Sequence, residues 1–279
     1  MSEPARRPAL FLALALGAGA LPAETPESLL AASDLFARSP GELRLELEVG
    51  AEGAPERVPL EIWRGGPERA LVRFLDPRER GKFVLRLGAE TWFLAPGASR
   101  PVKLGAAFRL QGGAALDELL GLSLARDYRI AGVESAGGVT TFDLEAQSPT
   151  AAYPKVRWAV DAARRRPLRA ELRTAAGKTL KVIEFRSWLD EKELVPGEVA
   201  IADLVRGGKL VARFLAVDPR PVPPALFSLE DGAARAALAA RPPGAGAGGR
   251  SSTTAVATGA PTFSANQATS SSTRSMVSA

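Results

Sequence analysis

The sequence contains no histidine and no cysteine in 279 residues, and each absence excludes several kinds of chemistry. Without cysteine there are no disulfides, redox dithiols or iron–sulfur clusters, and no lipid can be attached to an N-terminal cysteine. Without histidine, the Ser-His-Asp and Cys-His nucleophile systems and the zinc sites built from His and Cys are also excluded. Enzymes that use carboxylates alone, or lysine and tyrosine, stay open. We therefore expect a non-enzymatic protein with no cofactor and no metal.

A large excess of one charge is also missing, because 36 basic residues face 31 acidic ones and the formal net charge is only +5. Most basic residues stand singly in strand patterns opposite apolar neighbours, which is typical of a solvated sheet face. The one dense run, residues 164–166, precedes Pro167 between two strand patterns and predicts an exposed hairpin loop. A phosphate-binding stripe is the alternative interpretation. We expect the solvated face, and no nucleic-acid partner.

The first 23 residues predict an export signal. Arg6 and Arg7 form a short positive region, residues 9–16 are apolar, and residues 18–20 form a small-residue cleavage site, with cleavage after Ala23 as the alternative. The apolar run is shorter than the roughly 20 residues that a spanning helix needs. A buried N-terminal helix is the competing interpretation. We expect an exported protein with no membrane span after cleavage.

A helix is predicted over residues 25–39. Thr25 can accept a hydrogen bond as the N-cap, and Pro26 stands at the first helical position, where its missing N–H costs nothing. Leu29, Leu35 and Phe36 lie on the apolar side of this helix. The helix therefore needs an apolar surface to cover, which the following sheet supplies.

Residues 42–49 (ELRLELEV) alternate strictly between leucine or valine and a charged residue, which predicts a half-buried strand. Similar strand patterns recur about every ten residues with short turns between them, as in an antiparallel meander. We predict strands at residues 58–63, 71–75, 83–87, 91–94, 102–104, 108–110, 127–133, 140–146, 153–161, 168–173, 179–185, 199–203 and 209–217. A short helix is predicted at residues 114–122; the glycines before it form either a hinge for a lid or a plain tight turn.

The regular region ends near residue 219. Leu226 and Phe227 are predicted to fold back as an apolar anchor, and residues 233–240 to form a terminal helix. From residue 242 the composition changes to glycine, alanine, serine and threonine, which predicts disorder because few large apolar residues can offset the entropy of ordering. The predicted organisation is a signal peptide (1–23), one folded domain (24–231) and a short helix followed by a disordered tail (232–279).

Several short motifs occur in a fixed order between residues 26 and 229. They are 73–77 (RFLDP) with 81–82 (GK), 92–96 (WFLAP), 126–128 (RDY), 153–156 (YPKV) with Trp158 and 160–161 (VD), 167–171 (PLRAE) with 177–178 (GK), 195–196 (VP), Asp203 and 226–228 (LFS). Their order and spacing resemble the outer-membrane lipoprotein-sorting protein family, the LolA-like group of the LolA/LolB superfamily.

The resemblance implies a mainly β (α+β) fold: a strongly curved antiparallel sheet, or half-open β-barrel, with helices covering its concave face. It also implies a monomeric periplasmic carrier for the acyl chains of lipoproteins or lipids, with an inner-membrane transporter and an outer-membrane acceptor as partners. The expected lining of the apolar cavity comprises Leu29, Phe36, Leu45, Leu47, Leu60, Ile62, Phe74, Leu85, Trp92, Leu94, Leu119 and Trp158. For each of these positions, an ordinary core role is the alternative.

We expect Phe74, Leu85 and Trp92 to face one apolar hollow, with Arg73 and Arg86 on the opposite face of their strands. Two rival functions stay open. One is an interaction or sensor module that uses the same fold to bind a protein, such as a transport complex or a stress regulator of the envelope. The other is an enzyme that uses paired carboxylates.

Overall fold

The computed structural model describes residues 25–35, 41–66, 68–98, 100–105, 122–149, 151–189, 195–230 and 232–242. The chain divides into two compact units, Met1–Ala245 and Gly246–Ala279, and all described residues belong to the first. The signal peptide, the strand at 108–110, the helix at 114–122 and the tail beyond 242 were predicted for parts of the chain outside the described residues.

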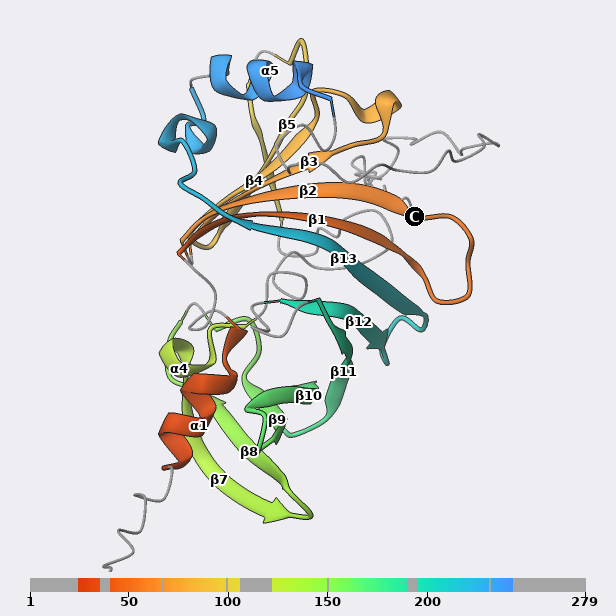
Figure 1. Cartoon of the computed structure of the whole chain (residues 1–279). Coiled ribbons are helices and arrows are strands. Elements are labelled where there is room, and N and C mark those ends of the chain that lie inside the picture. The colour runs from red at the N-terminus through yellow and green to blue at the C-terminus, as the bar shows by residue number, and fades with distance from the viewer. Residues whose placement is uncertain are drawn as a thin grey trace, which may run out of the picture. The chain divides into compact units, whose positions relative to one another are not determined.

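The described elements follow the predicted pattern of many short strands and few helices (Figure 1). In chain order they are α1 (Pro26–Ser33), β1 (Glu42–Ala51), β2 (Val58–Gly65), β3 (Arg69–Phe74), the 3-10 helix η1 (Pro77–Glu79), β4 (Phe83–Leu87), β5 (Glu90–Leu94), β6 (Val102–Leu104), α4 (Leu124–Asp127), β7 (Tyr128–Ala136), β8 (Val139–Ala146), β9 (Lys155–Asp161), β10 (Arg166–Arg173), β11 (Thr179–Trp188), β12 (Pro196–Asp203), β13 (Lys209–Pro219), the 3-10 helix η2 (Pro224–Phe227) and α5 (Ala233–Ala240). Among these, no helix is both long and apolar enough to cross a bilayer.

All thirteen strands form one open antiparallel sheet, in the order β6-β5-β4-β3-β2-β1-β13-β12-β11-β10-β9-β8-β7. The sheet curves in Figure 1, and β6 and β7 are its two edges. Strands β1–β6 form a first meander and β7–β13 a second, and within each meander every strand pairs with its neighbours in sequence. The pairing of β1 with β13 joins the two meanders. The predicted fold class, a mainly β protein built on a strongly curved antiparallel sheet, is confirmed.

Strand β1 defines the two faces of the sheet. Leu43, Leu45, Leu47 and Val49 are buried in the main hydrophobic core, as their alternation predicted. We call the side to which they point the inner face, and the opposite side the outer face. Helices α1 and α4 pack at the inner face, where Leu29, Leu30 and Leu124 join the same core.

The N-terminus of α1 is capped as predicted, because the backbone N–H of Ser28 donates to Thr25 Oγ1 at 3.2 Å. Helix α1 ends at Ser33, and the N–H of Asp34 bonds back to the carbonyl of Ala31. Residues 36–39 of the predicted helix lie outside the described residues. Ser33 Oγ accepts a hydrogen bond of 3.0 Å from Trp158 Nε1. This contact joins the helix to β9 on the inner face.

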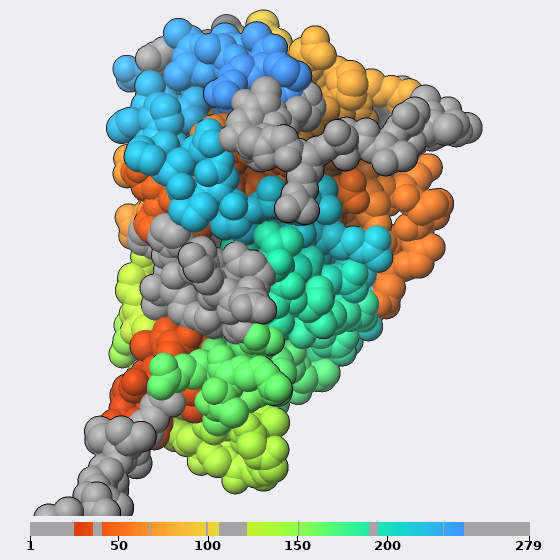
Figure 2. Space-filling model, viewed as in Figure 1, coloured from red at the N-terminus to blue at the C-terminus, as the bar shows by residue number. Residues whose placement is uncertain are grey.

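A second core lies on the outer face of β2–β5. Its buried residues come from the strands and from the C-terminal segment: Trp63, Leu71, Phe83, Leu85, Leu94, Val222, Leu226, Phe227 and Leu238. In Figures 1 and 2 the blue segment that carries η2 and α5 lies beside the orange strands of this region. The predicted anchor at Leu226 and Phe227 is therefore confirmed. Helix α5, predicted to follow the domain, packs on the domain through Leu238.

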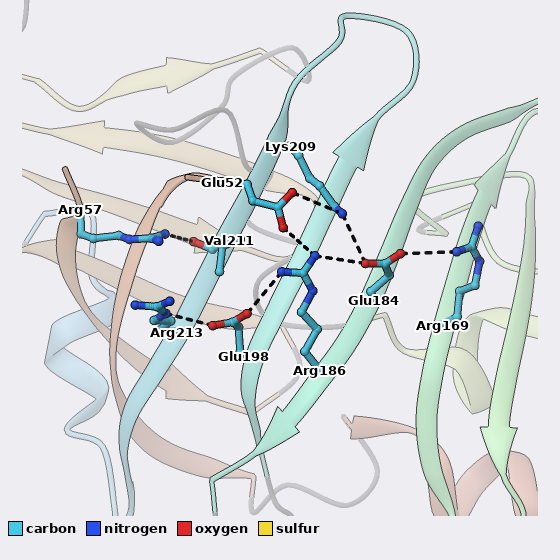
Figure 3. A network of polar contacts seen from close by, with 9 residues as sticks. All are labelled: Glu52, Arg57, Arg169, Glu184, Arg186, Glu198, Lys209, Val211 and Arg213. Carbon is cyan, nitrogen blue, oxygen red and sulfur yellow. Dashed lines mark hydrogen bonds and ion pairs between the residues drawn. The ribbon is translucent and has the colours of Figure 1, made fainter. Parts of the chain in front are cut away.

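The outer face of β10–β13 is charged instead of apolar (Figure 3). Arg186 pairs with Glu52 at 2.6 Å, with Glu184 at 3.3 Å and with Glu198 at 3.4 Å. Arg213 reaches Glu198 at 2.9 Å. These ion pairs connect neighbouring strands and leave the charges in contact with water, which agrees with a solvated sheet face.

Candidate functional site

The candidate site is the inner face of the sheet, because apolar side chains form continuous rows across it. In the first meander, strand register aligns five apolar residues: Leu45, Ile62, Val72, Val84 and Phe93. Each is the cross-strand neighbour of the next, and cross-strand neighbours on one face lie in contact. The first meander therefore presents one unbroken apolar row from β1 to β5.

The second meander carries a matching row. Strand register aligns Phe142, Trp158, Ala170, Ile183, Ile201 and Leu210 from β8 to β13. All six are buried in the same core as the first row. Because β13 pairs with β1, the two rows belong to one apolar surface that extends over most of the sheet.

Seven of the twelve predicted lining residues lie at this surface. Leu29, Leu45, Leu47, Leu60, Ile62 and Trp158 are buried in the inner core, and Phe74 packs against it. Phe36 and Leu119 lie outside the described residues. The structure brings these seven together as a core, and contact with a ligand stays a prediction.

The expectation that Phe74, Leu85 and Trp92 share one hollow was wrong. Leu85 pairs with Leu71 and Trp92, and these residues contribute to the outer core with Leu94. Phe74 pairs with Leu60 on the inner face. The alternation within each strand was read correctly, but the pairing of β3 with β4 places Val84, and not Leu85, beside Val72.

The prediction that Arg73 and Arg86 lie on the same face of the sheet was also wrong, because they lie on opposite faces. Arg73 points to the outer face, where its Nη1 donates to Glu61 Oε2 at 3.1 Å beneath the C-terminal segment. Arg86 is two residues from Val84 in β4, so its side chain points to the same inner face. Its cross-strand neighbour is Ala70 of the inner core. Its Nε donates to the carbonyl oxygen of Gly88 at 3.1 Å.

A buried charge cluster that was not predicted from the sequence lies at the end of the inner face, and it consists of Arg64, Asp34 and Arg86. Arg64 is 4% exposed and pairs with Leu43 and Ala70 in the sheet. Burial lowers the pKa of the Arg64 guanidinium to about 10; Asp34 raises this pKa and Arg86 lowers it. The side chain still carries its charge at neutral pH. Leu60, Ile62 and Arg64 alternate along β2, so counting positions was enough to place Arg64 on the inner face.

Asp34 connects this cluster to α4. Its Oδ2 accepts a hydrogen bond of 2.9 Å from the backbone N–H of Ala125, in the first turn of that short helix. From the same helix, Arg126 bonds Asp127 at 2.9 Å and reaches Glu68, in the β2–β3 turn, at 3.5 Å. The Asp127 hydrogen bond raises the pKa of Arg126. These contacts tie α1 and α4 to the end of the inner face where Arg64 lies.

In the described part of the chain, no carboxyl group whose pKa is clearly shifted has the raised pKa of a general acid. A general acid needs a raised pKa, whereas the carboxyl groups with a clear shift are all held below their usual range by arginine, lysine or backbone donors. They are Glu52, Glu145, Asp161, Glu171, Glu198 and Asp203. Within the same residues no group of three Asp or Glu side chains is placed to hold a metal ion.

The fold defined by this sheet and its inner face is that of the LolA superfamily. A LolA superfamily protein from Nitrosomonas europaea is 22% identical, with a TM-score of 0.60 over 72% of this chain and 96% of that chain. A Vibrio parahaemolyticus domain, provisionally described as an outer-membrane lipoprotein-sorting protein, is 19% identical, with a TM-score of 0.56 over 72% of this chain and 95% of that chain. A DUF1329 family protein from Desulfovibrio piger is 16% identical, with a TM-score of 0.55 over 71% of this chain and 96% of that chain.

The sequence itself matches one family model. The model is described as "Uncharacterized protein" and covers residues 66–231, and the chain belongs to this family. A comparison with curated proteins gave no match. The predicted resemblance is thus confirmed, and the likeness to the solved structures shows the fold.

Proposed function

We propose that the protein is a periplasmic carrier that binds the acyl chains of lipoproteins or lipids at the inner face and shields them from water during transfer between the envelope membranes. One observation carries the proposal: the inner face bears apolar rows across both meanders, from β1 to β5 and from β8 to β13. Of the described helices, α1 and α4 alone contribute side chains to this core, and they supply Leu29, Leu30 and Leu124.

Burial of the acyl chain provides the binding free energy. Each CH₂ group moved from water to an apolar surface contributes about 0.8 kcal/mol. One chain therefore supplies on the order of 10 kcal/mol before the costs of ordering the chain and the protein are subtracted. Binding of this kind needs no reacting residue and is reversible, as a carrier requires.

The proposed lining is Leu29, Leu45, Leu47, Leu60, Ile62, Phe74 and Trp158. Phe36 and Leu119, outside the described residues, stay in the proposal on the sequence pattern. Leu85, Trp92 and Leu94 leave it because they contribute to the outer core. Arg64 and Arg86, at the end of the inner face, are proposed to lie near the polar end of the bound molecule.

The proposed location and partners rest on the predicted export signal and on the fold. An exported carrier would collect its cargo at the inner membrane and release it to an acceptor at the outer membrane. The Vibrio parahaemolyticus domain of the same fold is described as a lipoprotein-sorting protein, which supports the proposal without deciding it.

Native mass spectrometry of protein purified from the periplasm, before and after organic extraction, tests the proposal. We expect the untreated protein to carry co-purified lipid and the extracted protein to take up a fluorescent acyl probe, which unlabelled lipid displaces. Protein that carries no lipid and binds no probe would rule out the carrier function.

An interaction module is the second candidate, and strand β7 favours it. This strand of nine residues forms one edge of the sheet, and most of its residues are exposed or half-buried. A free edge can pair with a strand of another protein. Extracted protein that binds no acyl probe but captures one defined envelope protein would support this function in place of the carrier.

A further inference from the structure

A hollow that the proposed function does not use lies on the outer face, beside α5. Its volume is about 520 Å³, and fifteen of the described residues line it. They come from the turn after η1, from β4 and β5, from the segment before β6 and from the C-terminal segment that includes α5. Pockets that hold small molecules typically measure about 300–1,000 Å³.

The floor of this outer pocket is apolar. Phe83 and Leu94 are cross-strand neighbours, and both are buried with 3% and 8% exposure. Helix α5 forms a wall, where the pocket is lined by the small side chains of Ala236 and Ala239. Leu238 holds the helix on the sheet, while these alanines leave the space beside it unfilled.

The lining is positively charged. The fifteen described residues of the lining include three arginines and one glutamate, which gives these residues a net charge of +2. Arg235 is buried and donates to the carbonyl oxygen of Ser228. Arg80 and Arg100 are exposed, and their guanidinium groups make no hydrogen bond or ion pair with any residue in the described part of the chain. Two guanidinium groups beside an apolar floor match a molecule with an anionic head and an apolar chain.

We propose that the outer pocket binds a single-chain anionic amphiphile, an alkyl carboxylate, whose head group pairs with Arg80 and Arg100 and whose chain lies on Phe83, Leu94 and α5. Guanidinium groups bind carboxylates through two parallel hydrogen bonds, which favours this head group. The site is independent of the carrier site because Phe83 and Leu94 lie on the opposite face of the sheet from Val84 and Phe93.

Isothermal titration of the full chain with decanoate, below its micelle concentration, tests the charge requirement. We expect binding that weakens at least tenfold in the double variant Arg80→Gln/Arg100→Gln and weakens with added salt. The matched control is Arg78→Gln, an exposed arginine two residues away that does not line the pocket. Decanol, which has the same chain without the charge, should bind more weakly. Absent binding, or equal binding by the double variant and the control, overturns the proposal.

A second pair of variants tests the position of the site. Ala236→Trp fills the pocket from the exposed side of α5, whereas Ala237→Trp places the same group on the same helix away from the lining. Decanoate binding should be lost in the first variant and kept in the second, with equal melting temperatures. Binding that survives Ala236→Trp contradicts the proposal. Acyl-probe binding at the inner face is measured separately, so either site can fail without the other.

Discussion

Trp158 Nε1 donates a hydrogen bond to Ser33 Oγ at 3.0 Å, and this contact fastens α1 to the inner face of the sheet. Both residues are buried, and the Trp158 ring also meets Phe185 edge-on with a centroid distance of 5.4 Å. Trp158 thus lies in the middle of the second apolar row while its polar atom is paired. A helix held by one buried hydrogen bond and a few apolar contacts can be tested directly.

Ser33→Ala should destabilise the protein by about 1–3 kcal/mol, because the buried indole N–H of Trp158 loses its acceptor. Urea unfolding at equilibrium measures the change. The matched control is Ser28→Ala, an exposed position of the same helix, which should differ from the parent by less than about 0.5 kcal/mol. Equal stability of both variants would mean that the contact contributes nothing.

Glu61→Gln should destabilise the protein by about 3–5 kcal/mol, the cost of breaking a buried ion pair on one side. Glu61 is 2% exposed; it accepts from Arg44 Nε at 2.5 Å and from Arg73 Nη1 at 3.1 Å. Burial lowers the pKa of Arg44, but the interactions with Glu61 and Glu46 together outweigh it and leave this pKa raised. The substitution removes the negative charge between two buried cations, while Arg44 keeps its pair with Glu46 and Arg73 keeps its hydrogen bond to the carbonyl oxygen of Arg241.

The control for this variant is Glu48→Gln, a half-buried position of β1 with no ion-pair partner among the described residues. It should leave the urea midpoint nearly unchanged. A Glu61 variant as stable as the Glu48 variant would show that the ion pairs of Glu61 with Arg44 and Arg73 do not contribute to stability.

Gly65→Ala should destabilise the protein by about 1–3 kcal/mol through overpacking. A Cβ atom on Gly65 would stand 2.4 Å from Phe227 Cε2, so η2 must shift away from the sheet. Gly41→Ala is the control, since a Cβ there meets nothing within 4 Å. Thermal melts of the two variants should differ by several degrees; identical melts would show that η2 does not pack closely on β2.

The stability contributed by Glu198 should depend on pH. Hydrogen bonding to Arg213 lowers the pKa of Glu198 below its usual 4.5. Because the folded pKa is depressed, the stabilisation is complete above about pH 4.5 and is lost as the pH falls through the folded value. Glu198→Gln should cost about 0.2–1 kcal/mol at pH 7, as for exposed pairs, and less at pH 3.

Parallel urea titrations at the two pH values measure this difference. Glu56→Gln, at an exposed position without an ion-pair partner in the described residues, should match the parent at both. A cost for Glu198→Gln that is the same at pH 3 as at pH 7 would assign the effect to packing instead of charge.

The sequence predicted the strands well because alternation in each strand is a local signal. In β1 the alternation of leucine with charged residues was sufficient to identify the buried side. The Thr25 cap was equally local. Both kinds of prediction depend on residues that are close together in the chain.

The assignment of faces in β3–β5 was not local, and it failed there. Both faces of these strands are apolar, since Val72 and Val84 face the inner core while Leu71 and Leu85 face the outer one. The outer face of these strands is covered by η2 and α5, which lie more than 120 residues further along the sequence. Alternation within a strand does not show which of its faces lies on the same side of the sheet as a given face of the next strand. The register between β3 and β4, which η1 connects, decides this.

The most direct test of the carrier proposal is the fluorescence of Trp158 in the presence of a lipopeptide with a brominated acyl chain, which quenches an indole ring on contact. In a variant that keeps Trp158 alone of the four tryptophans, we expect saturable quenching. A sister variant that keeps only Trp92, which packs against the outer core, should not be quenched. Quenching of Trp92 but not of Trp158, or of neither, would contradict an acyl-binding inner face.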